Sequence, residues 1–338
     1  MTAYLALASV VLGLSIGPMQ AGSRLERIQR RGMLVCGIEP AVAGFAELDA
    51  QGRYRGLDVD VCRAVAAAIF GTPDKVRYGT VSSVADFLRT DEIDVVSRRL
   101  TWELRREAPL GLLFGPITFY DGQGFLVSRK LGITSPEQLA GLPLCVAGGT
   151  VFEFNVTTWF NAHGRGIRKV LLESASKFGD IAAALAAGRC GAYTADVSEL
   201  GAIQLALPSP GDFHILTQQI SREPLAPLVR QDDPRFFNIL RWTIFALINA
   251  EELGVTAANA DDMRKSPSVD VQRLLGVASG NGKALGLDET WAYQAIKAVG
   301  NYGEMFDRNL GRQSAIGLER GLNRLSTDGG LMYAPPLR

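Results

Sequence analysis

The sequence lacks the residue clusters that build metal centres, cofactor sites or nucleic-acid surfaces. Its only two histidines, His163 and His214, lie far apart without a nearby cysteine, so a zinc site is not expected. The 35 Lys and Arg residues balance 35 Asp and Glu, without a basic cluster that would attract phosphates. No Walker loop, dinucleotide fingerprint or Cys-x-x-Cys pair occurs, and the single Gly-x-Ser-x-Gly lies at residues 13–17. We therefore expect no cofactor, no metal ion and no nucleic-acid partner.

The composition is that of a folded globular protein. Hydrophobic residues make up 47% of the chain and charged residues 21%. The 338 residues are enough for about two domains, each with its own core.

A single apolar run stands at the start of the chain. Residues 4–17 read YLALASVVLGLSIG, which is the length of a signal-peptide core and short for a membrane span. We predict a secretory signal peptide over residues 1–22 and export from the cytoplasm, although no Lys or Arg precedes the run. The alternative is an uncleaved N-terminal anchor.

Four cysteines fit export into an oxidising compartment. Three pairings are possible. We favour Cys36 with Cys62 and Cys145 with Cys190, because each pair then closes within one half of the chain. Four buried thiols remain the alternative.

Strand and helix patterns alternate twice along the chain, which is typical of parallel sheets covered by helices. We predict an α/β protein of two lobes with a ligand cleft between them. Lobe 1 comprises residues 24–124 and 223–338, the latter ending in a helical extension, and lobe 2 comprises residues 125–222. Glycine-containing or proline-containing extended segments at residues 120–129 and 224–230 are expected to cross between the lobes as hinge strands.

Several stretches resemble one family of exported proteins. They are GLDVDVCRAVAAAIFG (56–71), TFYDGQGFLV (118–127), RWTIFALINAEELGVT (241–256), WAYQAIKAVGNYGEMFDRNLG (291–311) and GGLMYAPPLR (329–338). From about residue 24 to the end, the chain resembles the general L-amino-acid-binding subgroup of periplasmic solute-binding protein family 3 of ABC transporters. The resemblance implies the type II periplasmic-binding-protein fold and a monomer.

An amino acid carries a carboxylate and an ammonium on one carbon, and burying either without a partner is costly. By similarity to the family, Thr101 and Arg106 are the carboxylate clamp at the start of a helix, where amides also favour an anion. Asp196 corresponds to the acid that receives the ammonium, and Phe45 to an aromatic wall. Alternatively, Arg106 is a solvated charge, Asp196 caps a helix and Phe45 only packs.

The second lobe contributes through Gly149 and Thr150, which open a helix and should offer their amides to the carboxylate. Here the chain departs from the subgroup, because Val151 and Phe152 replace threonines and Val151 removes a hydroxyl. Before Thr101, Arg99 and Leu100 replace Asn-Thr. Either Arg99 biases the site towards an acidic or otherwise altered ligand, or the site binds amino acids weakly or not at all.

The resemblance implies a non-enzymatic receptor that captures a small ligand and delivers it to an inner-membrane ABC permease. One alternative is a dehydratase-like enzyme on the same fold, with Glu39, Glu153 and Asp196 as candidate acids or bases. Another is a ligand sensor, which would use the same site with a different partner.

Overall fold

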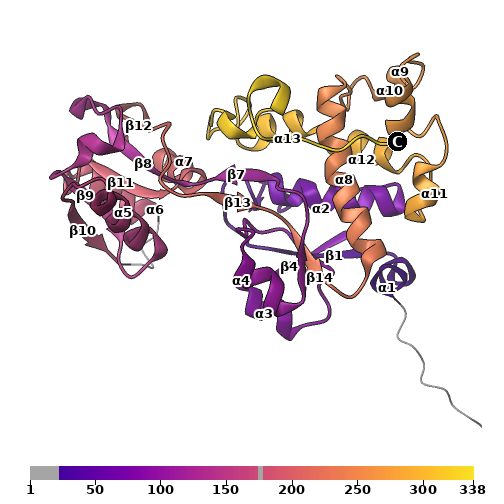
Figure 1. Ribbon diagram of the computed structural model, residues 1–338, viewed down its shortest axis with the longest axis horizontal. Coiled ribbons are helices and arrows are strands. Elements are labelled where there is room, and N and C mark those ends of the chain that lie inside the picture. Colours follow the sequence, from indigo (N-terminus) through magenta and orange to yellow (C-terminus); the bar gives the residue numbers. More distant parts are fainter. Residues whose placement is uncertain (1–22, 174–177) are drawn as a thin grey trace, which may run out of the picture.

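The computed structural model describes residues 23–173 and 178–338. Two α/β lobes are joined by a narrow pair of strands, with lobe 2 at the left and lobe 1 at the right of Figure 1. This confirms the predicted two-lobed fold. The predicted signal peptide at residues 1–22 lies outside the described residues. None of the described helices combines the length and apolarity needed to cross a bilayer.

Lobe 1 contains a five-stranded sheet in the order β4-β1-β5-β14-β6. Strands β4, β1 and β5 are parallel, whereas β14 is antiparallel to β5 and β6. The strands are β1 (Leu34–Ile38), β4 (Val76–Thr80), β5 (Val95–Val96), β6 (Leu112–Phe114) and β14 (Leu228–Arg230). A small hairpin of β2 (Glu47–Leu48) and β3 (Tyr54–Arg55) and the helices α1 (Arg24–Arg31), α2 (Leu57–Phe70), α3 (Val84–Arg89), α4 (Leu104–Glu107) and α8 (Pro234–Glu252) complete the lobe.

Lobe 2 repeats this arrangement in the order β10-β9-β11-β8-β12. Strands β10, β9 and β11 are parallel, and β8 is antiparallel to β11 and β12. The elements are β8 (Gln123–Ser128), β9 (Pro143–Ala147), α5 (Val151–Ala162), β10 (Arg168–Leu172), α6 (Phe178–Ala186), β11 (Ala192–Asp196), α7 (Val197–Leu205) and β12 (Phe213–Ile215). In both sheets, the antiparallel strand is the one that the chain forms directly after it crosses between the lobes, β8 in lobe 2 and β14 in lobe 1.

The crossing consists of β7 (Phe119–Asp121) and β13 (Glu223–Leu225), which pair antiparallel with Asp121 opposite Glu223. These short strands lie between the two lobes in Figure 1. Because the lobes are connected through so few backbone hydrogen bonds, the crossing is the natural hinge for a change in their relative orientation.

Helix α2 illustrates how the local sequence positions the elements of lobe 1. Its N-cap is Gly56, whose φ of 131° disfavours other residues, and a Cβ there would lie 2.1 Å from the carbonyl oxygen of Phe45. The helix ends at Gly71 in the left-handed conformation. Most of its side chains are buried, because it packs against strands of the sheet and against α8 and α12 (Trp291–Val299).

The chain continues after α8 as a helical extension that packs on lobe 1 (Figure 1). Its helices are α9 (Ala260–Met263), α10 (Val269–Leu274), α11 (Asn281–Leu285), α12 (Trp291–Val299) and α13 (Tyr302–Asn309). The extension also holds the hinge strand β7. The side chain of Asn323 accepts from the backbone N–H of Tyr120 at 2.7 Å and donates to its carbonyl at 3.1 Å, and the Tyr302 hydroxyl donates to the Thr118 carbonyl at 2.9 Å.

One disulfide lies in each lobe. Cys36 on β1 pairs with Cys62 on α2, and Cys145 on β9 pairs with Cys190 before β11. The Cα separations of 6.2 and 5.7 Å lie within the usual range. The pairing within halves favoured by the sequence is confirmed, and each bond fixes a sheet strand to its neighbouring segment.

We expect the Cys145→Ser/Cys190→Ser variant to unfold at lower urea concentration than the parent. The bond closes a loop of 45 residues, for which the chain-entropy model gives a loss of about 4 kcal/mol in unfolding free energy. Equilibrium unfolding followed by circular dichroism without reductant measures the loss. Reductant opens both disulfides of the parent, so the reduced parent should match a variant in which Cys36 and Cys62 are replaced as well. Equal stability of the Cys145→Ser/Cys190→Ser variant and the parent would contradict a stabilising role of this bond.

The Asn323→Ala variant tests the attachment of the extension to the hinge. Removing the amide leaves the N–H and carbonyl of Tyr120 without these partners, which should lower the unfolding free energy by about 1–3 kcal/mol. Urea unfolding provides the measurement, with Asn161→Ala on the exposed surface of α5 as the matched control. Equal losses in the two variants would show that Asn323 does not stabilise the hinge.

Candidate functional site

Acidic side chains meet where the hinge enters lobe 2. Asp121 ends β7 and lies opposite Glu223 on β13. Two residues after Asp121, Gln123 on β8 pairs with Asp196 at the end of β11. Strand register therefore places three carboxylates on neighbouring strands at the junction of the lobes.

Asp196 occupies the N-cap position of α7 but makes no capping hydrogen bond. Its Oδ1 atom is buried and has no hydrogen-bond partner among residues 23–173 and 178–338. Burial raises the pKa of Asp196 to about 8, and the charges of Asp121, Glu223 and Glu199 add to the rise, while Arg99 opposes it. A pKa near 8 leaves Asp196 mostly protonated at neutral pH, and a cationic partner beside it would return it to the carboxylate form that accepts hydrogen bonds.

Asp121 performs the capping instead. Its Oδ1 accepts from the backbone N–H groups of Gly122 at 2.9 Å and Ser198 at 3.3 Å, so it binds the start of α7 from the hinge strand. The side chain is 3% exposed, and Oδ2 has no hydrogen-bond partner in the described part of the chain. Burial raises the pKa of Asp121 to about 6, while the Ser198 hydroxyl and the N–H groups of Gly122 and Ser198 oppose the rise. The sequence prediction missed this residue, although it lies in the quoted stretch TFYDGQGFLV.

Arg99 is the cation that faces these acids from lobe 1. Its charge lowers the pKa values of Asp121, Asp196 and Glu199, against the larger effect of burial. The guanidinium lies 5.5 Å from the ring centroid of Phe45, and Nη2 is 3.6 Å from Oε2 of Glu39. Arg99 adopts a φ of 52°, which is uncommon for a residue with a side chain and is found where the surroundings hold the backbone in place.

Phe45 is 2% exposed and packs edge-to-face on Phe119 of β7. It therefore packs in the core of lobe 1 and also supports the Arg99 guanidinium. Packing, the alternative role of Phe45, is therefore present, and the contact of its ring with Arg99 also connects it to the site.

Thr101 and Arg106, the predicted carboxylate clamp, are both bonded to protein carboxylates. The Thr101 hydroxyl donates to Oε2 of Glu223 at 2.8 Å. Arg106 forms an ion pair with Glu103, with Nε 3.0 Å from Oε1, and Nη1 donates to the Thr101 carbonyl at 3.1 Å. The helix at this position is α4, which has only four residues, with Thr101 before its start and Arg106 inside it.

In lobe 2, Thr150 is the N-cap of α5 as predicted, and its hydroxyl donates to the Ala147 carbonyl at 2.7 Å. The Gly149 amide, however, donates to Oε2 of Glu153 at 2.9 Å, so it is not free to bind a carboxylate in this conformation. Val151 is 60% exposed at the helix start. The structure thus gathers Arg99, Phe45, Thr101 and Asp196 around the hinge, and among the described residues no contact joins Arg106, Thr150 or Val151 to the Asp196 carboxylate.

The acids proposed for an enzyme differ in their surroundings. Glu39 pairs with Arg98, with 2.8 Å between Oε2 and Nη2. Glu153 pairs with Lys169 at 2.6 Å, and this bond lowers the pKa of Glu153. Burial raises the pKa of Asp196, in contrast to that of Glu153.

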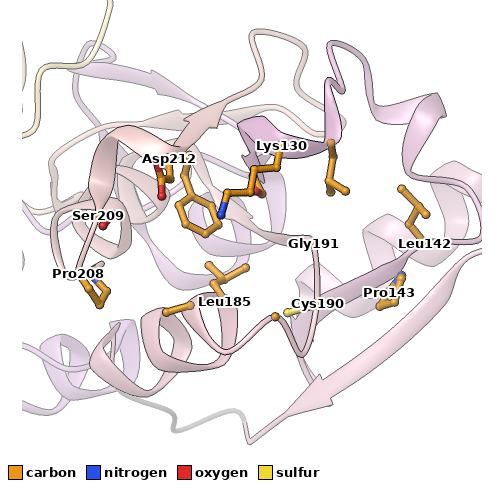
Figure 2. A pocket seen from close by; sticks show the side chains of 14 residues that line it. Lys130, Leu142, Pro143, Leu185, Cys190, Gly191, Pro208, Ser209 and Asp212 are labelled. Atoms are coloured by element: carbon orange, nitrogen blue, oxygen red, sulfur yellow. The ribbon is translucent and has the colours of Figure 1, made fainter.

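A cavity of about 580 Å³ lies elsewhere in lobe 2 (Figure 2). It is lined by residues at the end of β8, the start of β9 and the loop before β11, among them Ser128, Pro143 and Gly191. Asp196 stands at the opposite end of β11, so the cavity lies at the other pole of the sheet. Its lining includes Lys130 and Asp212 but none of the predicted ligand-binding residues.

Two lobes that meet at a polar junction define a class of proteins that hold a solute between domains. The family model described as bacterial extracellular solute-binding proteins, family 3, matches residues 34–258, and the chain belongs to this family. Helices α9 to α13 follow the matched segment.

Similar proteins cover almost the whole chain. The general L-amino acid-binding periplasmic protein AapJ of Rhizobium johnstonii is 43% identical over 340 residues, covering 98% of this chain and 99% of that protein. The glutamate/glutamine/aspartate/asparagine-binding protein BztA of Rhodobacter capsulatus is 42% identical over 337 residues, covering 98% of each. A solved structure of an ABC transporter/periplasmic binding protein from Brucella ovis with glutathione bound has a TM-score of 0.82 and 43% identity, covering 94% of this chain and 100% of that one.

The raised pKa of Asp196 predicts how the ligand-free protein responds to pH. Its pKa is about 8 in the folded chain against 3.8 unfolded, so its contribution to stability falls as the pH rises from about 4 to about 8. Asp196→Asn removes the charge that the parent has to bury at pH 9. The melting temperature of the variant should therefore exceed that of the parent by about 2–4 °C or more at this pH, since about 1 kcal/mol produces such a shift in a medium-sized domain. Thermal unfolding at pH 5 and pH 9 measures the difference.

Asp328→Asn, on the exposed surface, is the control and should change the melting temperature little at either pH. A difference between Asp196→Asn and the parent that is the same at pH 5 and pH 9 would contradict the assignment of the titration to Asp196.

Proposed function

We propose that this chain is the periplasmic receptor of an amino-acid ABC transporter, which captures a small ligand bearing an ammonium and a carboxylate and delivers it to an inner-membrane permease. The proposal includes export by a signal peptide and action as a monomer without catalysis. The observation that carries it is the unpartnered Oδ1 of Asp196, buried beside the unpartnered Oδ2 of Asp121 at the junction of two lobes. Buried acceptors without donors are costly, and a ligand ammonium would supply the missing donors.

The carboxylate end of the ligand is assigned to Arg106 and Thr101. Their present partners, Glu103 and Glu223, are protein carboxylates, which supports the chemical suitability of both donors for a ligand carboxylate. Lobe 2 would approach from the other side with Asp196 and the start of α5. Closure of the lobes then brings the two ends of one small ligand to opposite walls, and the ligand stabilises the closed form by contacts that bridge them.

Arg99 partly balances the acids of the junction from lobe 1, and its Nη2 atom lies 3.6 Å from Oε2 of Glu39. Its Nε atom is buried and has no hydrogen-bond partner among the described residues, so Arg99 still offers a donor to an acidic ligand side chain. The names of the relatives support α-amino acids, including acidic ones and their amides, and the Brucella ovis structure adds glutathione, which also carries an α-ammonium and an α-carboxylate. We therefore propose recognition of the α-amino-acid group, with room for different side chains.

A thermal-shift and calorimetric screen against the twenty L-amino acids and glutathione tests the proposal. A ligand at a hundredfold excess over its dissociation constant should add about 2.7 kcal/mol to the stability of the parent. Arg106→Ala and Asp196→Ala should each weaken binding at least tenfold, because each removes a charged hydrogen-bonding group worth about 1.5–3 kcal/mol.

Arg105→Ala, the exposed neighbour of Arg106, is the matched control and should bind like the parent. Mass spectrometry of the recovered ligand should find it unchanged, and conversion to a product would favour the enzyme alternative. If no amino acid or glutathione stabilises the folded parent, the proposed ligand class is wrong.

A further inference from the structure

Glu223 joins the two ends of the candidate site. It begins hinge strand β13, opposite Asp121 on β7. Its Oε2 accepts from the Thr101 hydroxyl at 2.8 Å, and its Oε1 accepts from the Ser221 hydroxyl at 2.9 Å. Its charge also raises the pKa of Asp196. Glu223 is therefore in contact with the clamp threonine of lobe 1 and within electrostatic reach of the acid of lobe 2.

The bond to Thr101 creates a conflict with the proposed binding of a carboxylate. A threonine hydroxyl has one proton to donate, and in this conformation Glu223 receives it. If Thr101 turns to a ligand carboxylate, Oε2 of Glu223 loses its donor next to Asp121 and Asp196. A carboxylate that loses its donor near other carboxylates is destabilised, so another donor has to replace the hydroxyl.

A ligand ammonium is the donor that fits this place. It has three N–H bonds and therefore needs three acceptors. Asp196 Oδ1 and Asp121 Oδ2 are buried acceptors without partners in the described chain. Oε2 of Glu223, released by Thr101, would be the third.

We propose that Glu223 is a ligand-binding residue that accepts a hydrogen bond from the ligand ammonium and, in exchange, releases the Thr101 hydroxyl to the ligand carboxylate. This inference rests on the proposed function and adds a specificity-determining residue to it. The exchange selects ligands in which an ammonium and a carboxylate are close together, as on the α-carbon of an amino acid. A carboxylic acid without the amine would take the Thr101 hydroxyl and leave Glu223 without a donor.

The test compares Glu223→Gln with the parent by isothermal titration calorimetry, using the L-amino acid that stabilises the parent most. Glutamine keeps the size of the side chain and an oxygen for Thr101 but removes the charge that attracts the ammonium. We expect the affinity to fall at least tenfold. Glu92→Gln, which removes one exposed acid at the far end of lobe 1, should bind like the parent. Unchanged affinity of Glu223→Gln overturns the inference.

A crystal structure of the parent with the same amino acid provides the second, independent measurement, and it needs no variant to fold. The inference expects an oxygen of Glu223 within hydrogen-bond distance of the ligand nitrogen and the Thr101 hydroxyl turned to the ligand carboxylate. A complex in which Thr101 still donates to Glu223 overturns it, even if Glu223→Gln binds weakly. If the parent binds no amino acid at all, the proposed function itself fails, which separates that outcome from a failure of Glu223 alone.

Discussion

Burial of several carboxylates at the junction of two lobes is the constraint on which the site depends. Asp121 and Asp196 are held close together in a poorly hydrated place, where two negative charges repel and neither is well solvated. Arg99 offsets part of this repulsion from lobe 1, and the peptide N–H groups of Gly122 and Ser198 satisfy one oxygen of Asp121. A positively charged donor entering the junction would satisfy the remaining acceptors, which is the link we propose between the electrostatics of the junction and ligand capture.

The hinge strands supply these groups as well as connecting the lobes. Asp121 is the last residue of β7 and Glu223 is the first of β13, so the residues that cross between the lobes are also residues of the site. A ligand that bound there would act directly on the segment that connects the lobes. The extension after α8 is attached to the same strand through Asn323 and Tyr302, so a part of the chain outside the two sheets also restrains the hinge.

Much of the fold followed from the sequence, because its signals are local or nearly so. Alternating strand and helix patterns predict two α/β halves, and the pairing of Cys36 with Cys62 and of Cys145 with Cys190 follows from keeping each bond within one half. The resemblance to a known family pointed to Asp196 and Thr101, and a departure from that family pointed to Arg99. The structure brings all three to the hinge. The resemblance did not indicate that α4 would have only four residues, or that Thr101, which precedes α4, would bridge to Leu225 beside the hinge.

The sequence by itself determined which side chains are available and which elements carry them. Only the tertiary structure decided how these side chains are paired. Thr101 and Glu223 are 122 residues apart, and Asp121 caps a helix that begins at Val197, so no local pattern relates them. Strand register brings such residues together and buries them. That burial raises the pKa of Asp196, a change that the chemistry of an aspartate alone does not predict.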